Sequence, residues 1–189
     1  MKESLKNYFA NTFAATTDEI EQVASAFSEK SVKKNETLLA KGEICKYTYF
    51  VCRGSIRAYS FNDNGQEATR YIAFENQFIT TIHSFISQSP TNEFIEATEK
   101  GEILQISFSD FQNIIEKTAL AKELYKKQLE VANTTNHLRL ESFLKLSAKQ
   151  RYDLLLESNP AVIQRLSNKI VASYLGITQE SLSRIKAQK

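Results

Sequence analysis

Four polar side chains near the C-terminal end of the chain have the spacing of one hydrogen-bonding face. They are Gln179, Glu180, Ser183 and Arg184. At the period of an α-helix these residues share one side, and the apolar residues between them fall on the other. The polar side combines amide, carboxylate, hydroxyl and guanidinium groups. It is the kind of face that the major groove of DNA would meet.

The residues before and within this segment predict a helix-turn-helix that positions the polar face. Two steeply crossing helices need a small residue where they touch and a glycine where the chain reverses, and Ala172 and Gly176 fill these places. Thr178 suits the N-cap of the second helix, which would begin at about Gln179. Apolar side chains converge inside the crossing at Val171, Leu175, Ile177, Leu182 and Ile185.

The charge distribution favours this motif over an ordinary helical hairpin. In such a hairpin Glu180 would only complement the positive end of its helix. Residues 161–189 hold one acidic residue, Glu180, and five basic ones: Arg165, Lys169, Arg184, Lys186 and Lys189. This segment therefore has net charge +4, and the other 160 residues sum to −2, because the whole chain has +2. Basic charge beside the motif is what phosphate binding requires.

Composition bounds the remaining possibilities. A chain of 189 residues with 42% hydrophobic content can bury a core as one large or two small domains. The sequence has no run of about 18 apolar residues, and residues 1–7 lack a signal-peptide core, so we expect a cytoplasmic protein without a membrane partner. Cys45 and Cys52 are too few for a disulfide framework or an iron–sulfur cluster, and free thiols are expected.

Periodicity divides the chain into a strand-rich part with helices on both sides. Residues 3–27 predict two short helices, the second starting near Thr17. Short alternating or apolar runs follow, separated by turn residues, at 31–34, 37–39, 47–52, 55–60, 69–74, 94–97 and 103–107. This spacing predicts a small antiparallel β-roll.

Residues 109–157 predict helices again, one of them long. Leu124, Val131 and Leu138 recur every seven residues within it, with polar Gln128 and Thr135 at alternate seam positions. Two interpretations stay open: this helix lines a dimer interface, or it packs on its own β-roll.

The order of these parts resembles the Crp/Fnr superfamily of bacterial transcription regulators. The likeness rests on the β-roll run 49–57, which closes on glycine at Gly54, on the long helix, and on the helix-turn-helix ending at 178–184. It implies an α+β fold with a double-stranded, cyclic-nucleotide-binding-like β-roll. The expected domains are residues 1–118 (β-roll with N-terminal helices), 119–146 (dimerisation helix) and 147–189 (helix-turn-helix domain). Because the sequence stops at Lys189, the wing that usually follows is expected to be absent or truncated.

The resemblance also implies partners and contacts. A homodimer formed through Leu124, Val131 and Leu138 would place its recognition helices in successive major grooves, about 34 Å apart, on a palindromic operator in double-stranded DNA. Arg184 would pair with a guanine edge, and Glu180 would accept from a cytosine amine. The supporting or phosphate-binding residues would be Gln179, Ser183, Thr178, Lys169, Lys186 and Ser167. RNA polymerase is a further candidate partner.

The expected effector region departs from the cyclic-AMP-binding members. Residues 75–85 lack their Gly-Glu helix start, and Asn92 and Glu93 stand where an arginine would bind the phosphate. A carboxylate there repels phosphate, so we expect no physiological cyclic AMP binding. The polar residues of this region are Thr80, Thr81, Ser84, Asn92 and Glu93. They would either bind an unknown small ligand or cap an empty roll.

No feature of the sequence indicates an enzyme. Metal-dependent β-roll enzymes gather several histidines inside the barrel, whereas only His83 falls within this roll. Catalytic motifs, metal ligands and cofactors are therefore not expected. The alternative function is an adaptor or sensor that does not bind DNA and uses the β-roll for a small ligand or a protein partner.

Overall fold

The computed structural model describes residues 1–188 and divides into two compact units. The first unit comprises Met1–Ala58 and Ile72–Glu130. The second comprises Tyr59–Tyr71 and the chain from Val131 on. Two strands and the longest helix therefore contribute residues to both units.

The first unit begins with two helices, α1 (Lys2–Thr12) and α2 (Thr17–Ser25), in agreement with the sequence-based expectation. The start of α2 is a capping box: Glu19 N donates to Thr16 Oγ1 at 3.3 Å, and Thr16 N donates to the Glu19 carboxylate at 3.0 Å. Tyr8 of α1 packs against the rings of Phe50 and Phe78, with centroid distances of 5.5 and 5.6 Å. These contacts fix α1 on the aromatic core of the first unit.

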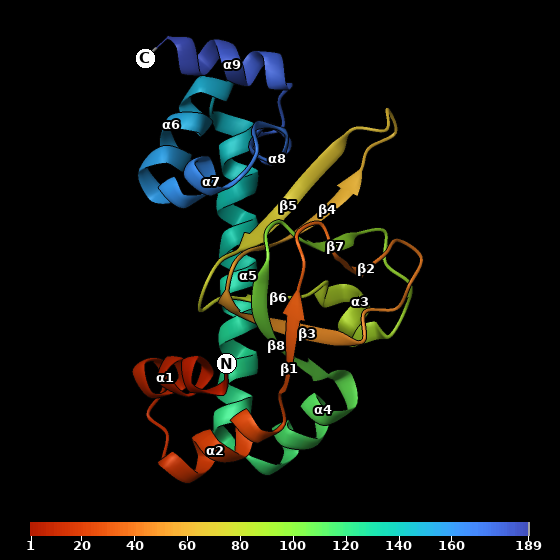
Figure 1. Ribbon diagram of the computed structural model, residues 1–189, viewed down its shortest axis with the longest axis vertical. Coiled ribbons are helices and arrows are strands. Elements are labelled where there is room, and N and C mark those ends of the chain that lie inside the picture. Colours follow the sequence, from red (N-terminus) through yellow and green to blue (C-terminus); the bar gives the residue numbers. More distant parts are fainter. Residues whose placement is uncertain (189) are drawn as a thin grey trace. The chain divides into compact units, whose positions relative to one another are not determined.

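The strands form two antiparallel sheets, which confirms the predicted β-roll. Their bounds are β1 (Ser28–Val32), β2 (Thr37–Leu39), β3 (Tyr47–Arg53), β4 (Ile56–Phe61), β5 (Glu67–Ala73), β6 (Phe78–Ile79), β7 (Phe94–Ala97) and β8 (Gly101–Ser107). One sheet has the order β1-β8-β3-β6 and the other β2-β7-β4-β5. Strands β4 and β5 form a long hairpin (Figure 1).

Strand β8 approaches β3 closely at one point of the backbone. Strand β8 pairs with β1 and β3, and it buries Ile103, Leu104 and Ile106 in the core. Its first residue, Gly101, faces the irregularity in β3, where a Cβ atom would lie 2.4 Å from the carbonyl oxygen of Arg53. Only glycine fits there, because any side chain would push the two strands apart.

The remaining helices carry the chain to the C-terminal region (Figure 1). The first unit contains α3 (Ile82–Ser87) and α4 (Phe108–Lys117), and α5 (Ala119–Lys145) contributes to both units. The second unit continues with α6 (Ala148–Ser158), α7 (Pro160–Arg165), α8 (Asn168–Leu175) and α9 (Gln179–Ala187). Its buried apolar side chains are Tyr59, Tyr152, Leu155, Val162, Leu166, Val171, Ala172, Leu175, Leu182 and Ile185.

Three short elements were not predicted from the sequence. They are β6, α3 and α7, of two, six and six residues. None is long enough to show a hydrophobic period. Pro160 occupies the first turn of α7, where the amide hydrogen that proline lacks would have no helical partner. Asn159 before it is both the C-cap of α6 and the N-cap of α7.

Candidate nucleic-acid interface

Helices α8 and α9 form the helix-turn-helix that the sequence predicts. Gly176 takes the left-handed conformation, with φ 66° and ψ 38°, and reverses the chain after α8. The amide of Ile177 then donates to the carbonyl of Ala172 at 3.0 Å. The next helix begins at Gln179, after Thr178, whose hydroxyl accepts from the Ser181 amide at 3.2 Å. Both helix ends at the turn are therefore hydrogen-bonded.

The two faces of α9 differ in their exposure. Leu182 and Ile185 are buried against the rest of the second unit. The four polar residues Gln179, Glu180, Ser183 and Arg184 are exposed. The structure thus presents these four side chains together along one helix, and their contact with DNA stays a prediction.

Arg139 of α5 holds the end of α8 in place. Its Nη2 atom donates to the carbonyls of Tyr174 and Thr69, at 2.9 and 2.8 Å. The guanidinium carbon lies 4.4 Å from the ring centroid of Tyr174 and 4.9 Å from that of Phe143. Burial lowers the pKa of Arg139 from its ordinary value, and the interaction with Tyr174 opposes this change. Arginine keeps its charge under such a shift, so α8 ends against a fixed cation.

Arg151 of α6 supports the same turn from a second helix. Its Nε donates to the carbonyl of Leu175 at 3.2 Å, and its Nη1 donates to that of Leu146 at 2.8 Å. The guanidinium carbon is 4.7 Å from the centroid of Phe143. The two arginines thus satisfy carbonyls at the ends of α5 and α8, where helical partners are lacking.

The expected phosphate-binding residues lie at the N-terminal side of α8 and on α9. Ser167 is the N-cap of α8 and accepts from the Ile170 amide at 3.4 Å. Lys186 Nζ donates to Asn168 Oδ1 at 2.6 Å, which ties α9 to the start of α8. Lys169 forms an ion pair with Glu67 of β5. Lys189, also counted in the basic charge, lies outside the described residues.

Strand β5 contacts α8, a relationship that sequence reasoning missed. The hydroxyls of Thr69 and Ser173 are buried and lie 2.6 Å apart. These residues are 104 positions apart in the chain. A contact of such sequence separation leaves no periodic signal, and neither residue type is unusual where it stands.

The long helix exposes only part of the predicted dimer seam. Val131 and Leu138 are 39% and 58% exposed. Leu124 is 2% exposed and belongs to the core of the first unit. The prediction that it lies in a dimer seam is therefore wrong, because its own chain already covers this side chain. The heptad period did not show whether these residues pack within their own chain or against a partner helix, because either kind of packing buries the same stripe of the helix.

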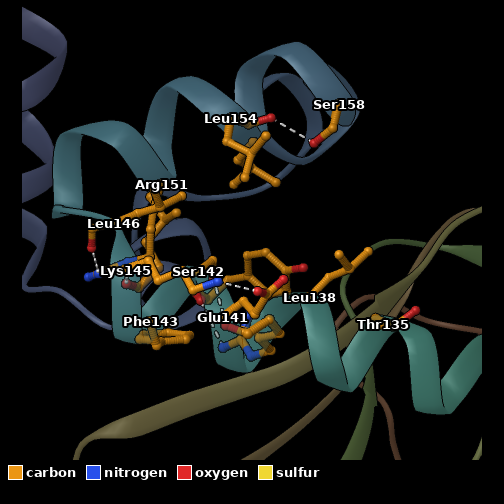
Figure 2. Close-up of a pocket in the computed structure, with 14 residues that line it drawn as sticks. Thr135, Leu138, Glu141, Ser142, Phe143, Lys145, Leu146, Arg151, Leu154 and Ser158 are labelled. Atoms are coloured by element: carbon orange, nitrogen blue, oxygen red, sulfur yellow. Dashed lines mark hydrogen bonds and ion pairs between the residues drawn. The ribbon is translucent and has the colours of Figure 1, made fainter.

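A groove of about 540 Å³ continues the exposed seam (Figure 2). Leu138 of α5 and Leu154 of α6 line it from two helices, and Leu154 is 47% exposed. Thr135, Ser142 and Lys145 of α5 also line this groove. Together with Leu138 they follow one another at intervals of three or four residues, so they share one face of the helix. The second unit therefore has a groove that includes Leu138 of the predicted dimer seam.

The residues expected to bind an effector are largely engaged within the first unit. Thr80 Oγ1 donates to the carbonyl of Tyr47 at 3.1 Å, and Ser84 Oγ accepts from the Cys45 amide at 2.9 Å. Thr81 differs, because its hydroxyl is buried and has no hydrogen-bond partner among the described residues. Asn92 is exposed and Glu93 half-buried. The structure thus leaves effector binding at these residues a prediction.

A buried ion pair within the β-roll was not predicted. Arg57 of β4 donates to Glu96 of β7 at 3.0 Å, and their side chains are 5% and 15% exposed. The charge of this guanidinium is already balanced by a carboxylate. It therefore joins two neighbouring strands inside the first unit.

No group of three or more His, Cys, Asp or Glu side chains within residues 1–188 could hold a metal ion. None of the helices described there combines the length and apolar character that crossing a membrane requires.

Comparison with known proteins gives the same assignment for the β-roll. Residues 29–118 match the family model of the cyclic nucleotide-binding domain. No curated protein sequence matches the chain significantly. The family match covers β1 from its second residue and all of the strands from β2 to β8, so the β-roll is similar to this domain.

Solved structures extend the likeness to nearly the whole chain. FixK2 from Bradyrhizobium japonicum has a TM-score of 0.72 and 17% identity, over 86% of this chain and 83% of that one. The c-di-GMP-responsive global regulator CLP from Xanthomonas campestris has the same TM-score and identity, over 92% and 91%. A protein from Eubacterium rectale assigned to the crp/fnr regulators has a TM-score of 0.71 and 19% identity, over 96% and 87%. The chain has the Crp/Fnr fold, which confirms the resemblance seen in the sequence.

Proposed function

We propose that this protein is a sequence-specific, DNA-binding transcription regulator. The observation that carries the proposal is the exposed polar face of α9, with Gln179, Glu180, Ser183 and Arg184 beside the capped turn after Gly176. A rigid helix with exposed hydrogen-bonding groups suits the major groove. The fold shared with FixK2 and CLP supports the same interpretation.

Roles for the individual residues follow from their chemistry. Arg184 would donate two hydrogen bonds to the O6 and N7 atoms of a guanine, and Glu180 would accept from the amine of a cytosine. Lys186 and the start of α8 near Ser167 would contact phosphates and set the register of α9. The expected operator therefore has G·C pairs at the positions that α9 reads.

We propose a homodimer as the active form. A second copy of α5 would lie along Val131, Thr135 and Leu138, and its end would enter the groove that Leu154 lines. Burying these exposed leucines would stabilise the pair. A two-fold axis in the protein would then require a palindromic operator.

We also propose that cyclic AMP is not the physiological effector, although the β-roll matches the cyclic nucleotide-binding domain. Glu93 stands where a phosphate-binding arginine is expected, and Arg57 already pairs with Glu96. Thermal unfolding in the presence of cyclic AMP, cyclic GMP or c-di-GMP tests this proposal. A saturable rise in the unfolding temperature with cyclic AMP would contradict it.

Selection from a random duplex pool at two salt concentrations tests the main proposal. We expect the purified protein to enrich a two-fold symmetric sequence, and we expect Arg184→Ala to relax the base preference at one position in each half-site. Salt-sensitive retention without enrichment would contradict sequence-specific binding. No retention at either salt concentration would instead favour the adaptor function.

A further inference from the structure

Strand β5 and helix α8 make two polar contacts in the same register. Glu67 pairs with Lys169, and Thr69 hydrogen-bonds with Ser173. Two residues along a strand span about 6.7 Å, and four residues along a helix span about 6 Å. The two spacings match, so both contacts form at once when the strand lies along the helix.

Arg139 reinforces this pairing from a third element. Its Nη2 donates to the carbonyl of Thr69 in β5 and to that of Tyr174 in α8. One guanidinium therefore holds the strand and the helix together. The position of Glu67 beside α8 is consequently set by the backbone of β5 as well as by its own ion pair.

The two partners of the ion pair differ in their exposure. The side chain of Lys169 is 60% exposed, whereas that of Glu67 is 10% exposed. An incoming phosphate can therefore reach the ammonium group, but it meets a carboxylate that is already in place. Two anions cannot both pair fully with one ammonium group, so phosphate binding at Lys169 has to weaken its pair with Glu67.

The surroundings of the ion pair lie next to the expected DNA-binding face. A groove of about 490 Å³ is lined by Phe61, Gln66 and Glu67 of the hairpin, and by Lys169, Thr178 and Gln179 of the helix-turn-helix. The carboxylate of Glu67 thus borders the groove that reaches the start of α9. Negative charge at this edge opposes the approach of a DNA backbone.

We propose that β5 is an autoinhibitory strand, in which Glu67 occupies Lys169 in competition with a DNA phosphate. This inference rests on the proposed DNA-binding function. While β5 lies on α8, Glu67 keeps Lys169 from pairing fully with a phosphate, so each protomer makes one phosphate contact fewer than it would without Glu67. The hairpin lowers the intrinsic affinity of the protein for DNA, and any change that draws β5 away from α8 raises it.

A double-mutant cycle on Glu67 and Lys169 tests the proposal. The full-length wild type, Glu67→Gln, Lys169→Gln and the double variant are titrated with a labelled random-sequence duplex at several salt concentrations. We expect Glu67→Gln to bind about two- to fivefold more tightly, with a salt slope steeper by about 0.9 per protomer because one more phosphate is neutralised. We expect Lys169→Gln to weaken binding less in the wild type than in the Glu67→Gln protein, where it should abolish the gain.

The control variant is Asp63→Asn, which makes the same charge change on the exposed turn of the same hairpin. If Asp63→Asn increased the affinity for DNA and steepened the salt slope as much as Glu67→Gln does, the proposal would be overturned. The loss of one negative charge anywhere on the hairpin would then explain both effects. An equal loss from Lys169→Gln in both backgrounds would also overturn it. If neither the wild type nor Glu67→Gln binds any duplex, the proposed DNA-binding function itself fails. Circular dichroism of each variant verifies that the protein is folded.

Discussion

The ring of Phe143 fills the space that a side chain on Gly176 would need. A Cβ atom built on Gly176 would lie 2.6 Å from Cε1 of Phe143. The ring is 39% exposed, and the guanidinium groups of Arg139 and Arg151 both lie over it, so a shift of the ring would disturb both of these contacts. The turn of the helix-turn-helix therefore requires glycine for two independent reasons, its left-handed backbone and the adjacent ring.

Gly176→Ala should destabilise the second unit. We expect a loss of about 1 kcal/mol from the left-handed conformation and a further loss of about 1–3 kcal/mol from the steric clash. Urea unfolding measures the total. In a Phe143→Ala background the same substitution should lose only the backbone part. An equal cost in both backgrounds would show that the ring does not restrict this position.

Arg184→Ala should weaken specific DNA binding by about 1–3 kcal/mol and relax base preference at one position in each half-site. Lys186→Ala should instead weaken binding to all sequences alike, since a phosphate contact carries no base information. Binding assays on a selected operator and on its single-base variants separate the two effects. Unchanged base preference in the Arg184 variant would contradict the assigned orientation of α9.

Leu138→Glu should dissociate the proposed dimer. A carboxylate on the seam would be buried against the partner helix, and we expect a dissociation constant raised at least about tenfold. The matched control is Leu144→Glu, on the same helix at a residue that is 75% exposed and outside the groove. Analytical ultracentrifugation should find the control dimeric. Equal dissociation by both variants would argue against this seam.

Cys52 should react slowly with alkylating reagents at neutral pH. Burial raises the pKa of its thiol to about 11, so at pH 8 only about one thiol in a thousand is the reactive thiolate. The alkylation rate should increase with pH up to about 11. Because the folded pKa exceeds the unfolded value, this group's contribution to stability is lost as the pH rises through the same range. Mass spectrometry after iodoacetamide treatment measures the rate. A rate at pH 8 equal to that of the urea-unfolded chain would contradict this protection.

Local patterns predicted most elements because their causes are local. The cap at Thr178 and the reversal at Gly176 depend on residues within one turn of each other. Strand alternation in the same way indicated the β-roll. The heptad at Leu124, Val131 and Leu138 was less informative, because a period shows that a stripe is buried but not what covers it.

The sequence by itself determined the helix-turn-helix, its exposed polar face and the Crp/Fnr architecture, since these follow from spacing, turn chemistry and the order of elements. Only the tertiary structure decided that Leu124 belongs to an internal core, that Arg139 joins Thr69 to Tyr174, and that Glu67 pairs with Lys169. Each of these relationships joins residues far apart in the chain. Their energies depend on distance in space, which periodicity does not record.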